Sequence, residues 1–131
     1  MNRAARVFTD WFVRIYPDPT RPLVVFAGTG NNGGDGLAVA RMLDQAQYSA
    51  KVIICDFGPR HSADYESQLA SLSEFSGLSA VVFHSFETFQ EAYGDELAKN
   101  AVVIDALFGS GLSRPLEDDW AQMIDYLNNS R

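Results

Sequence analysis

Residues 23–45, LVVFAGTGNNGGDGLAVARMLDQ, decide the fold because they join a short apolar run to a helical pattern through a glycine-rich segment. Leu23 to Ala27 show no polar alternation, which is typical of a strand buried on both faces of a parallel sheet. Leu37 to Gln45 repeat apolar residues at helical spacing. We therefore expect a strand, a glycine-rich loop over 28–36 and a helix.

The same alternation of strands and helices continues along the chain. Further strands are predicted over 51–55, 80–83 and 101–104, and further helices over 3–15, 86–98 and 118–127, with another that is capped by Ser62 and runs to Phe75. Strands that alternate with helices pair in parallel, because right-handed crossovers return the chain to the same sheet. We therefore predict an α/β fold, a three-layer α/β/α Rossmann-like sandwich with a mainly parallel sheet.

Composition narrows the possible partners and the compartment. The 131 residues carry 10 Lys and Arg against 17 Asp and Glu, a formal net charge of −7, which argues against nucleic acid or an anionic membrane as the main partner. No apolar run approaches the ~18 residues that a spanning helix needs. Asp10 and Arg14 interrupt any secretory h-region, and Cys55 has no second cysteine to pair with. We therefore expect a cytoplasmic domain with no membrane partner.

The segment Gly28–Gly33 satisfies G-x-G-x-x-G between a predicted strand and a predicted helix. Glycines there allow positive φ and close approach of a phosphate, and the helix that follows offers unpaired N–H groups. Asp56, after the second strand, lies about where a ribose-binding acid is expected. This pattern favours a dinucleotide binder, such as a Rossmann-type NAD-binding oxidoreductase.

The continuation of this segment suggests more than a phosphate turn. Asn31, Asn32 and Asp35 bring carbonyl and carboxylate oxygens into it, which suit a ligand hydroxyl or an alkali or alkaline-earth cation. No lysine follows the glycines, so a Walker A loop is excluded. The alternative is an ordinary turn, because Asn, Asp and Gly all tolerate turn geometry.

Asp105 follows the fourth apolar strand and precedes a second glycine-rich segment. An acid at such a place is costly unless it is paired, hydrogen-bonded or bound to a metal, which indicates a site. The alternative is that Asp105 braces the next turn. Gly109, Ser110 and Gly111 could add backbone donors for a phosphate, and Arg114 a bidentate contact.

Two stretches resemble one known family. Residues 26–41, with their doubled Asn-Gly motif, and residues 103–116 are similar to the YjeF N-terminal domain, the NAD(P)H-hydrate epimerases. Residues 59–64 and 1–5 also resemble parts of that domain. The resemblance implies an isomerase that interconverts the R and S epimers of hydrated NADH or NADPH in nicotinamide nucleotide repair. It further implies a K⁺ cofactor, a fused or separate ADP- or ATP-dependent dehydratase as partner, and a homodimer.

The resemblance also implies residue roles. Asn31, Asn32, Gly33, Gly34 and Asp35 would contact the dinucleotide, and Gly109, Ser110, Gly111, Leu112, Ser113, Arg114 and Pro115 would hold its pyrophosphate region. Asn32 and Asp105 would be potassium ligands, and Asp105 the catalytic residue.

The chain departs from the family's pattern at both ends. The helix that the family carries before the position of Met1 is absent. The family's Asp-x-Pro-Ser-Gly motif is absent before the sequence ends at Arg131. We therefore expect residues 1–131 to be a domain incomplete at both ends, with weak or no turnover alone.

Two alternative functions follow from the same sequence. A non-catalytic nucleotide-binding or protein-interaction module of the same fold stays open. A dehydrogenase should carry a catalytic His or Tyr-x-x-x-Lys and a substrate half, which are not visible. His61 and His84 are expected to be structural or at the surface, and Cys55 to be a core residue.

Overall fold

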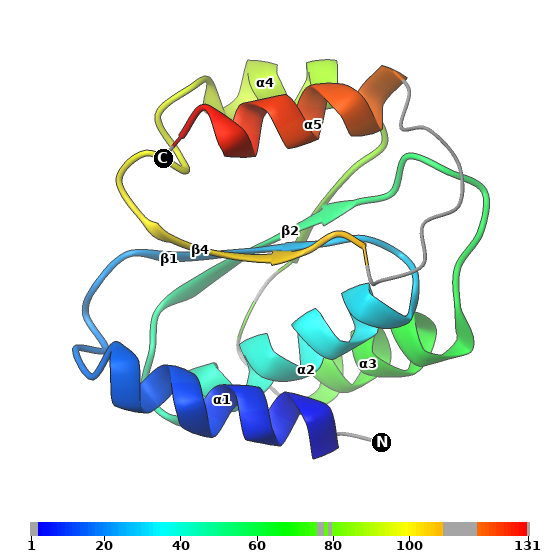
Figure 1. Ribbon diagram of the computed structural model, residues 1–131. Helices are drawn as coiled ribbons and strands as arrows, with labels where there is room; N and C mark the ends of the chain where they lie inside the picture. Colours follow the sequence, from blue (N-terminus) through cyan, green and yellow to red (C-terminus); the bar gives the residue numbers. More distant parts are fainter. Residues whose placement is uncertain (1–2, 76–77, 79, 109–117, 131) are drawn as a thin grey trace.

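Helices and strands alternate through the computed structural model, which describes residues 3–75, 78, 80–108 and 118–130 (Figure 1). The elements are α1 (Arg3–Ile15), β1 (Leu23–Ala27), α2 (Asn31–Gln45), β2 (Ala50–Cys55), α3 (Ala63–Phe75), β3 (Ala80–Phe83), α4 (Phe86–Tyr93), β4 (Val102–Ala106) and α5 (Asp118–Asn128). The predicted α/β class is confirmed.

The strands form one parallel sheet in the order β3-β2-β1-β4. Val25 in β1 lies beside Val52 of β2 on one side and Ile104 of β4 on the other. All five residues of β1 are buried, as expected for an inner strand covered on both faces. In the described part of the chain, β3 and β4 are the edge strands.

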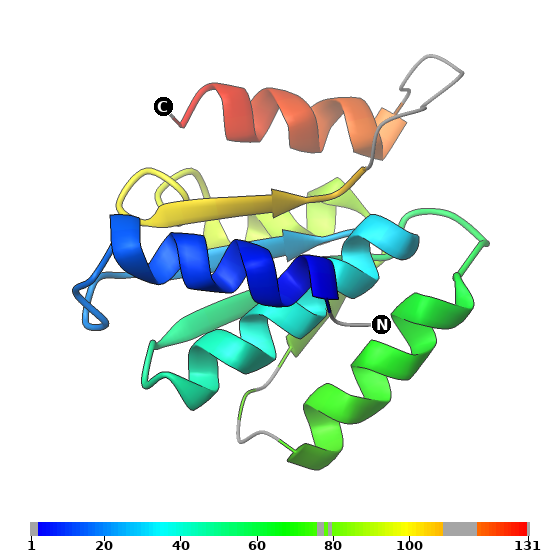
Figure 2. The same ribbon diagram turned by 60° about the horizontal axis from the view of Figure 1, so that its bottom comes forward.

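The helices cover both faces of the sheet. Figures 1 and 2 show α1, α2 and α3 against one face and α4 and α5 against the other. Val25 and Leu37 belong to the core on the first side, whereas Phe26, Phe89 and Met123 belong to the core on the second. Successive strand residues thus supply opposite cores, and the three-layer sandwich predicted from the sequence is confirmed.

The largest difference from the sequence prediction is the start of α2. This helix begins at Asn31, not at Leu37, so most of the expected loop over 28–36 is helical. A Cβ on Gly33 would lie 1.9 Å from the carbonyl oxygen of Gly28, and one on Gly36 would lie 2.5 Å from the Cβ of Ala106. These glycines allow close packing of the helix. The freedom to adopt a positive φ is not used by the described glycines of this segment, since Gly94 alone among the described glycines has one.

Two further element boundaries also differ from the prediction. Helix α4 ends at Tyr93 instead of residue 98, because Gly94 adopts φ +63° and its N–H donates to the oxygen of Gln90 at 2.7 Å. Strand β4 extends to Ala106, so Asp105 lies within it.

The apolar residues that recur at helical spacing in α1 are only partly buried. Phe12 is in the core, whereas Val7, Trp11 and Ile15 are exposed. None of the helices in the described ranges is both long and apolar enough to cross a membrane.

Candidate functional site

The carboxyl ends of β1, β2 and β4 surround a pocket of about 490 Å³, which we call the main pocket. Its walls come from the residues after these three strands and from α5: Thr29, Gly30, Asn31, Asn32, Gly58, Pro59, Arg60, Leu107, Phe108 and Trp120. Ligands of open parallel sheets bind at this edge, where strands end and helices begin. The main pocket is therefore the candidate binding site.

The N-terminus of α2 forms one wall of the main pocket. Gly30 is the N-cap residue, and because glycine has no side chain, it makes no side-chain hydrogen bond that caps the helix. The first backbone bond of the helix runs from the N–H of Gly34 to the oxygen of Gly30 at 3.0 Å. The N–H groups before Gly34 have no acceptor within the helix, and the helix dipole is positive at this end. This wall therefore suits an anionic ligand, as the sequence predicts.

Aromatic rings form the wall contributed by α5. The ring centroid of Trp120 lies 4.8 Å from that of Phe108 and 4.8 Å from that of Phe57. An exposed aromatic face provides a surface on which a planar base can stack. The sequence pattern placed Trp120 only within the predicted helix over 118–127, because the residues that its ring contacts come from distant parts of the chain.

A second pocket of about 220 Å³, the acidic pocket, lies between α1, α2 and β4. Asn32, Asp35 and Asp105 all line it, together with apolar residues of α1 such as Phe8. The structure thus brings together oxygen-bearing residues of the two segments that the sequence singled out. It does so because β1, which precedes α2, pairs directly with β4.

Asn32 lies between the two pockets and lines both. Its Nδ2 donates to the carbonyl oxygen of Phe108 at 2.7 Å. This bond fixes the amide, so that Oδ1 is the acceptor that Asn32 offers. Asn32 therefore couples the start of α2 to the end of β4.

Asp105 is exposed, so the cost of placing an unpaired acid inside the protein does not arise at this position. The reason is that β4 is an edge strand of the described sheet. Its Oδ1 accepts a hydrogen bond from the N–H of Leu107 at 3.1 Å, as in the alternative in which Asp105 braces the next turn. The second carboxylate oxygen can serve a ligand in addition to this brace.

Asp35 is the titratable group of the acidic pocket with an altered pKa. Burial raises the pKa of Asp35, and the negative charge of Asp64 on α3 raises it further. The carboxyl group of Asp35 is therefore easier to protonate than that of an ordinary aspartate.

The other predicted binding residues lie elsewhere. Gly33 and Gly34 are buried, and neither lines the main or the acidic pocket. A Cβ on Gly34 would lie 3.1 Å from the backbone of Asp64 and Tyr65, so this glycine lets α2 pack closely on α3. Contacts from Gly33 and Gly34 to the dinucleotide remain predictions. Gly109, Ser110, Gly111, Leu112, Ser113, Arg114 and Pro115 lie outside the described residues.

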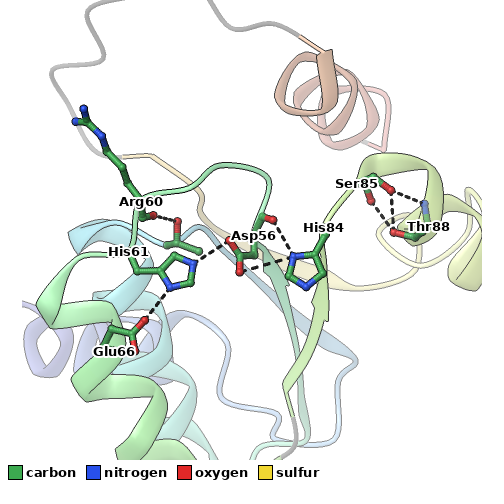
Figure 3. A network of polar contacts seen from close by, with 8 residues as sticks. Asp56, Arg60, His61, Glu66, His84, Ser85 and Thr88 are labelled. Carbon is green, nitrogen blue, oxygen red and sulfur yellow. Dashed lines mark hydrogen bonds and ion pairs between the residues drawn. The ribbon is translucent and has the colours of Figure 1, made fainter.

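The loop over 56–62, which we call the charged loop, follows β2 and carries a cluster that the sequence pattern missed. His61 Nε2 lies 2.9 Å from Asp56 Oδ1, and His61 Nδ1 lies 2.7 Å from Glu66 Oε1 (Figure 3). Both hydrogen bonds raise the pKa of His61, and the bond to Asp56 has the larger effect. The two negatively charged carboxylates thus favour the positively charged imidazolium form of His61, in which both ring nitrogens are hydrogen-bond donors.

This cluster changes the interpretation of Asp56. Its carboxylate, expected to bind a ribose, is engaged by His61, and His84 Nδ1 approaches its second oxygen at 3.8 Å. The signal in the sequence was the position of Asp56 and His84, each directly after a parallel strand. The two strands end at one edge of the sheet, which brings these side chains together.

Thr29 joins the charged loop to the segment after β1. Its Oγ1 donates to the carbonyl oxygen of Arg60 at 2.7 Å, and its own carbonyl oxygen accepts from the N–H of Ser62 at 2.9 Å. Thr29 is buried and lines the main pocket. Two walls of this pocket are therefore fixed relative to each other.

Cys55 is a core residue, which confirms the sequence prediction. The side chain is fully buried, and burial, with a contribution from the negative charge of Asp105, raises the pKa of its thiol to about 12. The thiol therefore stays protonated and unreactive at neutral pH.

The fit of a cation was tested on the donor set of the acidic pocket. Asn32 and Asp105 offer oxygen atoms, which hard cations prefer. In the described ranges no three His, Cys, Asp or Glu side chains are grouped so as to hold a metal ion. The oxygen donors of Asn32 and Asp105 fit the chemistry of a hard cation.

These features define an α/β domain of Rossmann-like architecture with a polar pocket at the carboxyl ends of its strands. The profile of the YjeF-related protein N-terminus family matches residues 1–131, and the chain belongs to this family. The resemblance stated from the sequence is thereby confirmed.

Named relatives agree with this assignment. The chain is 34% identical over 132 residues to the NAD(P)H-hydrate epimerase of Limosilactobacillus reuteri, covering 99% of this chain and 56% of the relative. It is 36% identical over 130 residues to that of Oenococcus oeni, covering 99% and 57%. The Bifunctional NAD(P)H-hydrate repair enzyme Nnr of Thermofilum pendens is 37% identical over 106 residues, covering 81% and 20%. The chain thus spans little more than half the length of the two epimerases.

A solved structure shows the same fold. The crystal structure of the yeast protein YNL200c superimposes with a TM-score of 0.77 at 23% sequence identity, covering 97% of this chain and 53% of the yeast chain. At this identity the likeness supports the architecture only.

Proposed function

We propose that this chain is an NAD(P)H-hydrate epimerase domain that interconverts the R and S epimers of hydrated NADH and NADPH. The observation that carries the proposal is the junction at Asn32, where a pocket suited to an anionic, base-containing ligand meets a pocket with carboxyl groups. The names of relatives at 34% and 36% identity support the same activity. An oxidoreductase is disfavoured, because these relatives are named as epimerases.

The two pockets would divide the work. The main pocket would hold the nucleotide, with the N-terminus of α2 on its phosphates and the rings of Phe108 and Trp120 along a base. The hydrated nicotinamide ring would reach the acidic pocket past Asn32. Asn31, Asn32 and Asp35 line one pocket or the other, as the predicted substrate contacts require.

Asp105 would act at the reacting ring. Epimerisation requires loss and return of a hydroxyl group on one carbon, through a ring that carries positive charge between the two steps. A carboxylate beside that ring would stabilise the charge. In its protonated form it would give a proton to the hydroxyl that leaves as water, and it would take a proton back when water returns. Asn32 and Asp105 would hold K⁺ through their oxygens, and the ion would supply fixed positive charge that orients these ligands and the substrate.

Partners and assembly follow the same proposal. A dehydratase, fused or separate, would consume one epimer, and the bifunctional protein of Thermofilum pendens is a relative whose name joins repair functions in one chain. A homodimer and a cytoplasmic location are further parts of the proposal.

The test is an epimerisation assay on the protein expressed from its complete reading frame. The purified R epimer of hydrated NADPH is supplied in potassium buffer, and the S epimer is followed by chromatography. We expect conversion faster than the spontaneous reaction. The Asp105→Asn variant, which can still accept from the N–H of Leu107, should lose at least about 100-fold in rate.

Controls separate catalysis from folding. Asp10→Asn alters an exposed acid on α1 and should leave the rate unchanged. Conversion no faster than in buffer, or an undiminished rate in Asp105→Asn, would contradict the proposal. The same assay on residues 1–131 alone tests the expectation of weak or no turnover, which robust conversion would refute.

A further inference from the structure

Arg60 stands apart from the other residues that line the main pocket. Among the described residues that line this pocket, Arg60 is the basic one and none is acidic. The chain as a whole carries 17 acidic residues and a net charge of −7. The described part of this wall, with one guanidinium and no carboxylate, therefore departs locally from the charge of the protein and favours an anionic ligand.

The guanidinium of Arg60 is uncommitted among the described residues. The ion pairs of the described part of the chain join Arg6 to Asp10, and His61 and His84 to their carboxylates, and none involves Arg60. Figure 3 shows the Arg60 side chain extending away from the His61 cluster. The neighbouring carboxylates, Asp56 and Glu66, are both engaged by His61. The cluster thus leaves Arg60 available for a ligand.

The backbone of Arg60 is fixed on both sides. Thr29 Oγ1 donates to its carbonyl oxygen at 2.7 Å, and the next residue, His61, is held by two carboxylates. The same Thr29 immediately precedes Gly30, the N-cap of α2. Arg60 and the helix N-terminus are therefore held in one frame around one pocket.

We propose that Arg60 binds a phosphate group of the dinucleotide and that Thr29 is the positioning residue that holds Arg60 toward the pocket. This inference rests on the proposed function for the identity of the ligand. The guanidinium has two alternative targets on the ligand. One is the diphosphate, which NAD and NADP share, and the other is the 2′-phosphate, which NADP alone carries. A guanidinium forms two parallel hydrogen bonds to either of them.

The experiment measures binding of NADP⁺ and NAD⁺ by calorimetry to the protein from its complete reading frame. We expect Arg60→Gln to raise the dissociation constant of NADP⁺ about 10-fold, the effect of one charge-assisted phosphate contact. Arg60→Lys should give a smaller rise, because lysine keeps the charge and loses the bidentate geometry. An equal rise for NAD⁺ assigns the contact to the diphosphate, and a rise for NADP⁺ alone assigns it to the 2′-phosphate.

A double-mutant cycle tests the role of Thr29. Thr29→Val keeps the side-chain volume and removes the bond to Arg60, and it should raise the dissociation constant about 3-fold in the wild-type background. In the Arg60→Gln background the same change should have no further effect, because the group that it positions is gone. A purely structural role for Thr29 would raise the constant equally in both backgrounds.

Arg14→Gln, an exposed arginine near the end of α1, is the matched control and should bind as the wild type does. Dissociation constants within twofold of the wild type in Arg60→Gln, for both nucleotides, would overturn the inference, as would the absence of binding by the wild type. Failure of the proposed function would look different: NADP⁺ would bind and depend on Arg60, while the epimers would interconvert no faster than in buffer.

Discussion

Two segments of the main pocket are shaped by opposite means. Residues 28–36, which we call the glycine segment, pack closely because their glycines have no side chains. Their absence lets α2 approach the backbone of Gly28 and the side chain of Ala106. The charged loop holds its form through side chains, with His61 between Asp56 and Glu66. Steric packing does not depend on pH or salt, whereas exposed ion pairs depend on both. The form of the first wall is therefore independent of pH and salt, whereas the form of the second depends on both.

The largest effect is expected at Gly33. An added Cβ would lie 1.9 Å from the carbonyl oxygen of Gly28, a backbone atom that cannot rotate away. We expect Gly33→Ala to lower the free energy of unfolding by about 3 kcal/mol or more, measured by urea denaturation. Gly30→Ala is the control within the same segment, because nothing lies within 4 Å of its added Cβ, and it should stay within about 1 kcal/mol. Equal costs at the two positions would refute the steric account.

Gly36 offers a clash that a second substitution can relieve. Its added Cβ would lie 2.5 Å from the Cβ of Ala106, so Gly36→Ala should cost about 2 kcal/mol in urea denaturation. Ala106→Gly removes the opposing atom and should by itself cost about 1 kcal/mol. The double variant should be more stable than the sum of the two costs predicts. Simple additivity would show that the two residues do not clash.

Ser62 tests the part of the charged loop that does not depend on ionisation. Its Oγ accepts from the N–H of Tyr65 at 3.0 Å and caps α3, as the sequence predicts. We expect Ser62→Ala to lower the free energy of unfolding by about 1 kcal/mol. The loss should be the same at pH 5.5 and pH 9, because a hydroxyl cap does not titrate. A loss present at only one of the two pH values would link the cap to the charge cluster.

His61 gives the smallest effect and the one that depends on pH. Asp56, and to a smaller extent Glu66, raise the pKa of His61 in the folded protein. The contribution of His61 to the stability of the fold is therefore fully present below the pKa of an unfolded histidine, about 6.5. That stabilisation is lost as the pH rises through the folded value. His61→Gln should cost about 0.5 kcal/mol at pH 5.5, since the side chain is 35% exposed and its pairs are screened.

The cost of His61→Gln should shrink toward pH 9, as followed by urea denaturation across the pH range. His84→Gln is the control, because that side chain is 76% exposed and the contacts of His61 remain. A cost that stays constant with pH would show that packing of the ring on Tyr65, at 5.2 Å between centroids, is its main contribution.

The sequence by itself determined the α/β class and most element boundaries. Apolar runs and helical spacing are local patterns, and the buried run of β1 already indicated an inner strand. The doubled Asn-Gly motif indicated the family, and Asn32 and Asp105 do line one pocket. These properties depend on residues that are close together in the chain or on the order of the elements.

Only the tertiary structure decided what the glycines, Asp105 and His61 do. The reason for Gly36 is Ala106 on another strand, and the exposure of Asp105 follows from the place of β4 at the edge of the described sheet. The cluster of His61 and the aromatic wall at Trp120 join side chains from separate elements. Sequence periodicity reports how one element alternates between core and solvent. It carries no information about which atoms of other elements pack against a given residue, and those contacts between elements determine the geometry of this site.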